Sequence, residues 1–121
     1  MSLTTDRNNS NLGYGVDESP IPQNKVYLVL SDEELAKGYV KPFRTSYKHL
    51  TCGTVTTMNE TISATYARDP WFYGATYCCG CQMHRPLDEF VWLPDGESMS
   101  PRMWSKEEFE RIVALRKGEM E

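Results

Sequence analysis

The chain has 121 residues, of which 40% are hydrophobic, and it carries a formal net charge of −4 at pH 7. This length fits one small domain, the acidic balance argues against a general nucleic-acid binder, and no apolar run approaches the roughly 20 residues of a membrane span. The N-terminus has no apolar signal-peptide core, so we expect a cytoplasmic protein, in which clustered cysteines bind metal more often than they form disulfides.

The first 24 residues are rich in Ser, Thr, Asn, Gly and Pro, and they show no hydrophobic periodicity. Segments of this composition bury too little apolar surface to offset the entropy lost on folding. We therefore predict a flexible N-terminal tail over residues 1–24 and a folded domain over residues 25–121.

The folded domain is predicted to begin with a strand and a short helix. Residues 25–30, KVYLVL, are β-branched and apolar, which favours a strand. Residues 31–38 predict a helix, because Ser31 and Glu34 have the spacing of a capping box. Gly38 is a typical stop at the C-terminal end of a helix.

A second helix is predicted over residues 56–70. Thr57 would cap its start, with Glu60 at the third position of a capping box. Pro70 disfavours helical backbone at the residue before it, so the helix should end there. Three apolar residues repeat every four positions and would share one face: Met58, Ile62 and Tyr66.

The C-terminal half is predicted to alternate short strands with turns before a last helix. Residues 72–77 and 89–93 are rich in aromatic and β-branched side chains, which favours strands. The PDG triplet at 94–96 favours a turn, since Pro fixes φ and Gly accepts a positive φ. The last helix should begin at its cap residue, Ser105, and run through residues 105–118.

Two ligand pairs have the spacing of zinc knuckles, and each has a glycine that lets the backbone turn tightly. The pairs are His49–Cys52 and Cys78–Cys81, separated by 25 residues. One CxxC-type pair alone is a weak signal, because redox proteins share it, but two half-sites in a small chain resemble structural Cys₃His sites. The sequence therefore predicts one structural Zn²⁺ bound by His49, Cys52, Cys78 and Cys81.

Two further potential ligands stand next to this set. Cys79 has the wrong spacing to join Cys78 at one ion, so we interpret it as a spare thiol. His84 follows Cys81 by three positions, which makes Cys81-x-x-His84 a rival pair. A ligand set that contains His84 therefore stays open, beside its interpretation as a hairpin residue close to the ion.

A closed set of four ligands argues against catalysis, because a catalytic zinc keeps one position open for water. The nearest enzyme pattern is that of the nucleobase deaminases, H-x-E followed by P-C-x-x-C. Here Thr51 stands at the Glu position and Tyr77 at the Pro position. We predict no catalytic residues and no enzyme, with a zinc-dependent hydrolase or deaminase as the alternative.

Residues 37–48 interleave basic and aromatic side chains without any acidic residue. Cations can neutralise phosphates while rings stack on bases, so this segment could bind nucleic acid. The simpler interpretation places Tyr39, Phe43 and Tyr47 in the core and leaves the cations solvated. The aromatic segment at 69–74 would anchor a protein partner if exposed, or would be core around the metal if buried.

The sequence resembles a group of small zinc-knuckle proteins encoded in tailed-phage genomes. The shared pattern covers roughly residues 31–92 and runs H-x-x-C-G-x-x-T-x-M, T-Y-A-R, F-Y-G-A-T-[FY]-C-x-x-C-x-x-H-x-P and E-F-x-W. The resemblance implies a phage origin and a metal site but no particular activity. Its ligand positions fall on His49, Cys52, Cys78 and Cys81. His84 matches the following His of the pattern, whereas Asn59 replaces an expected Gly and Cys79 stands at a variable position.

Taken together, the sequence predicts a small α+β domain of short strands and two to three helices, built round a structural zinc in the manner of a zinc ribbon or knuckle. The zinc-binding domain should cover residues 25–121. We expect a non-enzymatic protein that acts on a host or viral protein partner. We do not expect it to bind a membrane. The alternative is a nucleic-acid-binding accessory protein that uses the basic-aromatic segment 37–48.

Overall fold

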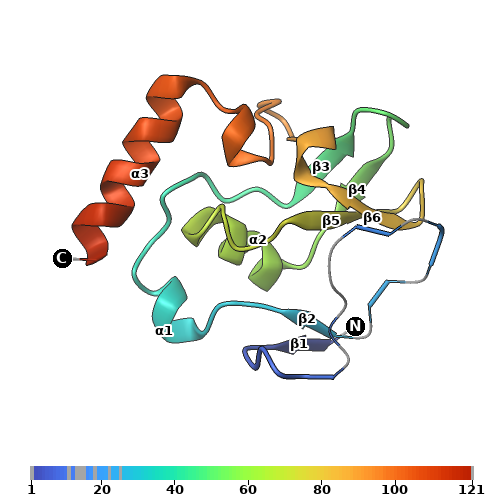
Figure 1. Ribbon diagram of the computed structural model, residues 1–121, viewed down its shortest axis with the longest axis horizontal. Helices are drawn as coiled ribbons and strands as arrows, with labels where there is room; N and C mark the ends of the chain where they lie inside the picture. Colours follow the sequence, from blue (N-terminus) through green and yellow to red (C-terminus); the bar gives the residue numbers. More distant parts are fainter. Residues whose placement is uncertain are drawn as a thin grey trace.

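The computed structural model describes residues 2–10, 12, 16–17, 19–21, 23–24 and 26–120, without the side chains of residues 119 and 120. Over these residues the chain forms an α+β fold of short strands and three α-helices, shown in Figure 1. The predicted fold class is therefore confirmed. In the described part of the chain, every helix is too short or too polar to cross a membrane.

The elements follow one another along the chain as strands interrupted by helices. The strands are β1 Ser2–Thr4, β2 Val26–Leu28, β3 Ser46–His49, β4 Val55–Thr57, β5 Ala75–Cys78, β6 Met83–Pro86 and β7 Phe90–Trp92. The α-helices are α1 Asp32–Leu35, α2 Glu60–Arg68 and α3 Lys106–Met120. Two 3-10 turns complete the fold, η1 Leu87–Glu89 and η2 Pro101–Met103.

The described strands form three small sheets. β1 and β2 pair in parallel, β4, β3 and β7 pair in that order as an antiparallel sheet, and β5 and β6 form an antiparallel hairpin. Figure 1 shows α3 at one side of the molecule, with the two antiparallel sheets at the other. The turns that join β3 to β4 and β5 to β6 therefore lie on the side away from α3.

Strand β3 shows how side-chain alternation positions the later site. Successive side chains of a strand point to opposite faces, and in β3 Tyr47 and His49 are buried while Lys48 between them is exposed. The register places Tyr47 opposite Trp92 and His49 opposite Phe90 on β7. The alternation thus turns the imidazole of His49 into the core.

The hydrophobic core is built mainly from aromatic side chains. Tyr66 meets Trp92 edge-on at 5.3 Å, and Tyr47 meets Phe90 edge-on at 5.5 Å, measured between ring centroids. Such edge-to-face pairs stabilise beyond the area that they bury. The buried members of this cluster are Tyr47, Tyr66, Cys78, Leu87, Phe90, Trp92 and Met99. Since Cys78 belongs to the cluster, one predicted ligand lies in the core itself.

The cap signals at α1 and α3 are confirmed. The Ser31 hydroxyl accepts a hydrogen bond from the Glu34 amide at 3.3 Å, and the Ser105 hydroxyl accepts one from the Glu108 amide at 3.2 Å. Gly38, two residues beyond the C-cap of α1, has a φ of +99°. L-residues with a Cβ rarely adopt this φ, so the glycine ends the helical segment as predicted.

The predicted start of the second helix is wrong. The residues expected in its first turn form strand β4 instead, because Thr56 pairs with Tyr47 and is buried. The side chain of Asn59 caps α2 by accepting a hydrogen bond from the Thr61 amide at 2.7 Å. The shared face is confirmed, since Tyr66 lies in the core and the other two apolar residues pack against it.

The predicted strands differ from the observed ones in length and number. Strands β2 and β7 lie within the predicted ranges 25–30 and 89–93, whereas the predicted strand at 72–77 begins later, at Ala75. Strands β3 and β6 were not predicted, because each contains polar or charged residues that are atypical of an apolar strand. At the predicted turn, Gly96 has a φ of +76°.

The described residues of the segment 1–24 make more contacts than its composition indicates. Within the described part of this segment, Ser2–Thr4 forms β1, which pairs with β2. The Asp17 amide donates a hydrogen bond to the His84 carbonyl at 2.9 Å, and the Ile21 amide donates one to the Gln82 carbonyl at 2.8 Å. The segment therefore has defined contacts with β2 and with the β5–β6 hairpin, while its flexibility in solution stays a prediction.

Candidate metal centre

The first knuckle is the tight turn between β3 and β4. The His49 amide donates to the Thr54 carbonyl at 3.0 Å, and the Gly53 amide donates to the His49 carbonyl at 2.8 Å. Gly53 has a φ of +76°, a conformation that favours glycine over every residue with a Cβ. The turn folds Cys52 back over His49, so that the Cys52 Sγ lies 3.3 Å from the His49 Nδ1.

The second knuckle is the turn between β5 and β6. It closes through the Gln82 amide, which donates to the Cys78 carbonyl at 2.7 Å, and Gln82 itself adopts a φ of +56°. The backbone amide of Cys81 lies 3.4 Å from the Cys78 Sγ and can donate to it. A backbone donor of this kind stabilises a thiolate, as a metal ligand requires.

Gly80 is the point at which the two knuckles touch. A Cβ at this position would lie 2.1 Å from the Thr54 Oγ1 and 3.2 Å from the Cys52 Sγ. A contact of 2.1 Å is far inside van der Waals distance, so any larger residue would push the turns apart. Glycine at this position therefore allows the close approach that brings the second pair of ligands to the first.

The four predicted ligands lie together. The ligand atoms of His49, Cys52, Cys78 and Cys81 all fall within 4.8 Å of one another. The Cys52 and Cys78 sulfurs are 3.5 Å apart, and the Cys81 Sγ is 3.4 Å from the His49 Nδ1. Ligand atoms on one tetrahedral zinc are about 3.5–3.8 Å apart, as bond lengths near 2.0–2.3 Å dictate. The donor set could therefore hold one metal ion.

Glu89 orients the imidazole of His49, and sequence reasoning missed it. The His49 Nε2 lies 2.7 Å from the Glu89 Oε1, and the Arg85 Nη2 donates to the Glu89 Oε2 at 3.0 Å. The hydrogen bond with His49, followed by that with Arg85, lowers the pKa of Glu89. The ionised carboxylate can only accept, so Nε2 carries the proton and Nδ1 presents its lone pair to the thiols.

Two of the clustered thiols, Cys52 and Cys81, differ in pKa. Hydrogen bonds from the side chain and backbone of Thr54 lower the pKa of Cys52 to about 6. Burial raises the pKa of Cys81 to about 11, and the neighbouring Cys52 and Cys78 add to the increase. A negative charge on one thiol makes ionisation of its neighbour less favourable, because like charges repel. A divalent cation would remove that repulsion. This chemistry of the donors fits a metal ion.

Cys79 and His84 are not brought into the cluster. Cys79 is exposed, and its amide donates to the Thr56 hydroxyl at 3.2 Å. Both ring nitrogens of His84 have other partners, because Nδ1 lies 2.7 Å from the Asp17 Oδ2 and Nε2 lies 2.8 Å from the Tyr27 hydroxyl. The structure therefore places His84 and Cys79 outside the group of four, and that Cys79 is a spare thiol stays a prediction.

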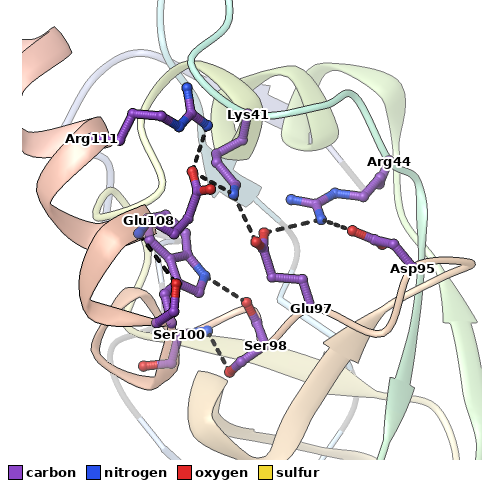
Figure 2. Close-up of polar contacts among 10 residues, drawn as sticks. Lys41, Arg44, Asp95, Glu97, Ser98, Ser100, Glu108 and Arg111 are labelled. Atoms are coloured by element: carbon purple, nitrogen blue, oxygen red, sulfur yellow. Dashed lines mark hydrogen bonds and ion pairs between the residues drawn. The ribbon is translucent and has the colours of Figure 1, made fainter.

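The basic-aromatic segment contradicts its simpler interpretation. Lys41 and Arg44 are buried rather than solvated, with side-chain exposures of 4% and 7%. Figure 2 shows both cations pointing toward Glu97, which accepts from Lys41 at 2.7 Å and from Arg44 at 3.2 Å. Asp95 binds Arg44 at 2.7 Å, and Glu108 of α3 lies 3.2 Å from Lys41. We call these five residues the Lys41 cluster.

The aromatic residues of the two segments divide between core and surface. Tyr47 is buried, whereas Tyr39 and Phe43 are exposed and stack on each other with centroids 6.0 Å apart. In the segment 69–74, the Tyr73 hydroxyl donates to the Leu28 carbonyl. Trp71 lies beside α3 instead of around the metal, with its centroid 5.8 Å from that of Phe109. Neither prediction for these segments is fully correct.

Comparisons with protein-family models, with curated proteins and with solved structures found no match for this chain. The chemistry of the site is therefore argued from its own donors. Three sulfurs and one nitrogen fill the coordination sphere of a tetrahedral ion and leave no position for water or substrate. Such an ion would fix the β3–β4 turn against the β5–β6 turn.

Proposed function

We propose that this protein is a small zinc-binding domain that acts without catalysis, by binding a host or viral protein partner in the host cytoplasm. The observation that carries the proposal is the convergence of four ligands from two hairpin turns. A closed ligand set favours a structural ion over a catalytic one. The resemblance to small phage-encoded proteins supports the viral origin and hence the class of partner.

Zinc is the metal that the donor set favours. Soft thiolate ligands select zinc, copper(I) or iron–sulfur clusters, and a tetrahedral set of three Cys and one His is typical of structural zinc. The core is small and rests on a few aromatic residues. In domains of this kind, the free energy of metal binding supplies much of the free energy of folding.

Metal content and a native thiol count on protein purified without a metal-affinity tag test the site. We expect one zinc per chain and one reactive thiol, that of Cys79. The variant Cys79→Ser should keep its zinc and lose the reactive thiol. Two or more reactive thiols in the zinc-loaded protein would contradict the closed set and would reopen a hydrolase or deaminase function.

Binding to a partner requires a separate test. The zinc-loaded protein can be cross-linked in a bacterial host extract, and each captured protein can then be purified and titrated with it by calorimetry. We expect at least one purified protein to bind the zinc-loaded chain but not the variant Cys81→Ser, which lacks one ligand. If no purified candidate binds, the proposed function is wrong even if the metal site is correct.

The nucleic-acid alternative has one observation for it and one against it. The exposed stack of Tyr39 on Phe43 could receive a base. Against it, the carboxylates of the Lys41 cluster already neutralise Lys41 and Arg44. Fluorescence anisotropy with labelled single-stranded DNA at low salt separates the two functions. Tight binding that weakens steeply with added salt would favour the alternative.

A further inference from the structure

A groove of about 300 Å³ lies between α3 and the loop that precedes β5. It is lined by Trp71, Phe109, Val113, Arg116 and Lys117. The Trp71 ring contacts two other lining residues. Its centroid lies 5.8 Å from that of Phe109, and the Arg116 guanidinium lies 4.9 Å from the Trp71 centroid. Trp104, which precedes α3 in the chain, packs against Trp71 with the two ring centroids 5.7 Å apart. The ring is therefore held in a fixed orientation.

Helix α3 leaves most of its apolar surface uncovered by the described part of the chain. Among its described side chains only Ile112 is fully buried. On the side of the helix that lines the groove, Phe109 is 37% exposed and Val113 is partly exposed. Two exposed apolar side chains one turn apart give this side of α3 an unpartnered apolar strip.

The rim of the groove is basic. Of the five residues that line the groove, Arg116 and Lys117 are cations and none is a carboxylate. Arg116 lies 3.4 Å from the Asp69 Oδ1, and Arg111 pairs with a carboxylate one turn earlier in α3. Lys117 is exposed and has no ion pair with any described residue. Among the described residues that line the groove, Lys117 therefore supplies the uncompensated charge, which is positive.

We propose that this groove binds an acidic peptide segment of the partner protein, with an aliphatic or aromatic side chain of the peptide against Phe109 and Val113. Carboxylates of the peptide would pair with Lys117 and Arg116 at the rim. Because the Arg116 guanidinium lies over the Trp71 ring, that ring face is closed to a stacked base, which favours a peptide over nucleic acid. The inference rests on the proposed function and gives it a surface and a partner chemistry.

The chemistry of the groove matches known energetics of binding sites. Binding energy concentrates in a few well-packed aromatic and arginine residues, and Trp71 and Arg116 already stack here without a partner. Rim charges contribute mainly to the association rate and to the salt dependence of binding. The peptide should therefore bind faster at low salt, while its apolar anchor sets the dissociation rate.

A displayed library of random twelve-residue peptides, selected on the zinc-loaded full chain, tests the proposal. We expect enrichment of peptides that carry several Asp or Glu and one Leu, Ile or Phe. A fluorescein-labelled copy of the most enriched peptide should bind Val113→Asp and Lys117→Glu at least about tenfold more weakly than the unchanged chain, a change of about 1.4 kcal/mol.

Each variant has a matched control on the same helix. Leu115→Asp introduces the same carboxylate outside the groove lining, and Lys106→Glu reverses a charge at the other end of α3. Both controls should bind the peptide as the unchanged chain does, and thermal melts should show that all four variants are folded.

The outcomes separate the two hypotheses. Enriched peptides that bind the groove variants and the controls equally would overturn the groove as the docking surface and leave a partner-binding function in place. Enrichment of basic or uncharged peptides would overturn the acidic partner. A selection that enriches no peptide on a chain that holds its zinc would overturn the groove as a peptide site, whereas the proposed function is decided by the cross-linking and titration of purified partners.

Discussion

The metal centre and the Lys41 cluster both bring distant polar groups together, and they do so by different means. The four candidate metal ligands come as two pairs, each spaced three residues apart. The ion pairs of the cluster join residues 51 to 56 positions apart, and the Lys41–Glu108 pair spans more. The first arrangement has a local signature in the sequence, whereas the second depends on the finished fold.

The two regions also differ in how their stability is distributed. On the metal side, one ion would hold two turns, so its loss would release both at once. In the Lys41 cluster, which includes Glu108 of α3, several ion pairs share the stabilisation. A buried ion pair contributes little to stability compared with an apolar replacement of similar size. Removing one partner of such a pair is costly, however, because the other charge stays buried. The largest effects should therefore come from the metal side.

Removal of the metal should have the largest effect. Zinc binding to small structural sites contributes about 10–16 kcal/mol of apparent free energy at pH 7, and small domains have a net stability of about 5–15 kcal/mol. If the proposed zinc is bound, a strong chelator should therefore unfold the region around the candidate metal centre. Circular dichroism and hydrogen exchange should show loss of structure in β3 to β7, with recovery on addition of zinc.

The cysteine variants sharpen this prediction. Cys81→Ser removes one of the four ligands and should reproduce the effect of the chelator without any chelator present. Cys79→Ser changes the neighbouring exposed thiol and should melt as the unchanged chain does. If both variants melt alike, Cys79 and Cys81 do not have the different roles that the geometry gives them.

Lys41→Met should have the next largest effect. It keeps the length of the side chain but leaves Glu97 and Glu108 without their shared cation, and both carboxylates are about a quarter exposed. Breaking a buried pair costs about 3–5 kcal/mol when the remaining charge is left alone, but Glu97 keeps Arg44 and Glu108 keeps Arg111, so we expect about 2 kcal/mol. Urea unfolding measures the difference. Lys37→Met breaks an exposed pair and should change the stability by less than about 1 kcal/mol.

The pH dependence of stability tests the ion pair between Lys41 and Glu108. Burial alone would raise the pKa of Glu108, but hydrogen bonds from Arg111 and Lys41 outweigh it and lower the pKa below 4.5. The contribution of Glu108 is therefore fully present above pH 4.5 and is lost as the pH falls through the lowered value. In Lys41→Met this acid-induced loss should be smaller. An equal loss in both proteins would contradict a role for Lys41.

The comparison also explains which parts could be predicted from the sequence. Cap residues such as Ser31 and Ser105 act within one turn of a helix, so their patterns are local and were read correctly. The two knuckle pairs are also local patterns, because the residues of each pair are three positions apart in the sequence. Glu89 could not be placed, since its partner His49 lies 40 positions away. A preference of ligating His for a carboxylate is general, but nothing in the sequence says which carboxylate.

The errors share a physical cause. The side chains of residues 37–48 were assigned by polarity, which places rings inside and cations outside. The fold reverses this for Lys41 and Arg44, because Trp104 and Trp92 lie under their charged groups and carboxylates lie beside them. Similarly, the start of α2 was set by a capping pattern at Thr57, but pairing of β4 with β3 took precedence.

Glu89→Gln should weaken metal binding without unfolding the zinc-loaded protein. Replacing a carboxylate that orients a ligating His lowers metal affinity by about 10–100-fold. Competition with a chromogenic chelator measures the affinity. Asp88→Asn is the matched control, because this adjacent carboxylate pairs with Arg102 and not with His49. If the two variants bind zinc equally well, the hydrogen bond from His49 to Glu89 does not orient the ligand.

Ser105→Ala should have the smallest effect, because it acts on the α3 side and on one hydrogen bond. The Ser105 hydroxyl caps the first turn of α3, and replacing such a cap by Ala costs about 1 kcal/mol. Hydrogen exchange should become faster in the first turn of α3 and stay unchanged in the β5–β6 hairpin. Ser31→Ala should give an effect of similar size confined to α1. If Ser105→Ala lowers zinc affinity as Glu89→Gln does, then α3 and the metal centre are coupled, and the two regions do not contribute independently to the stability of the domain.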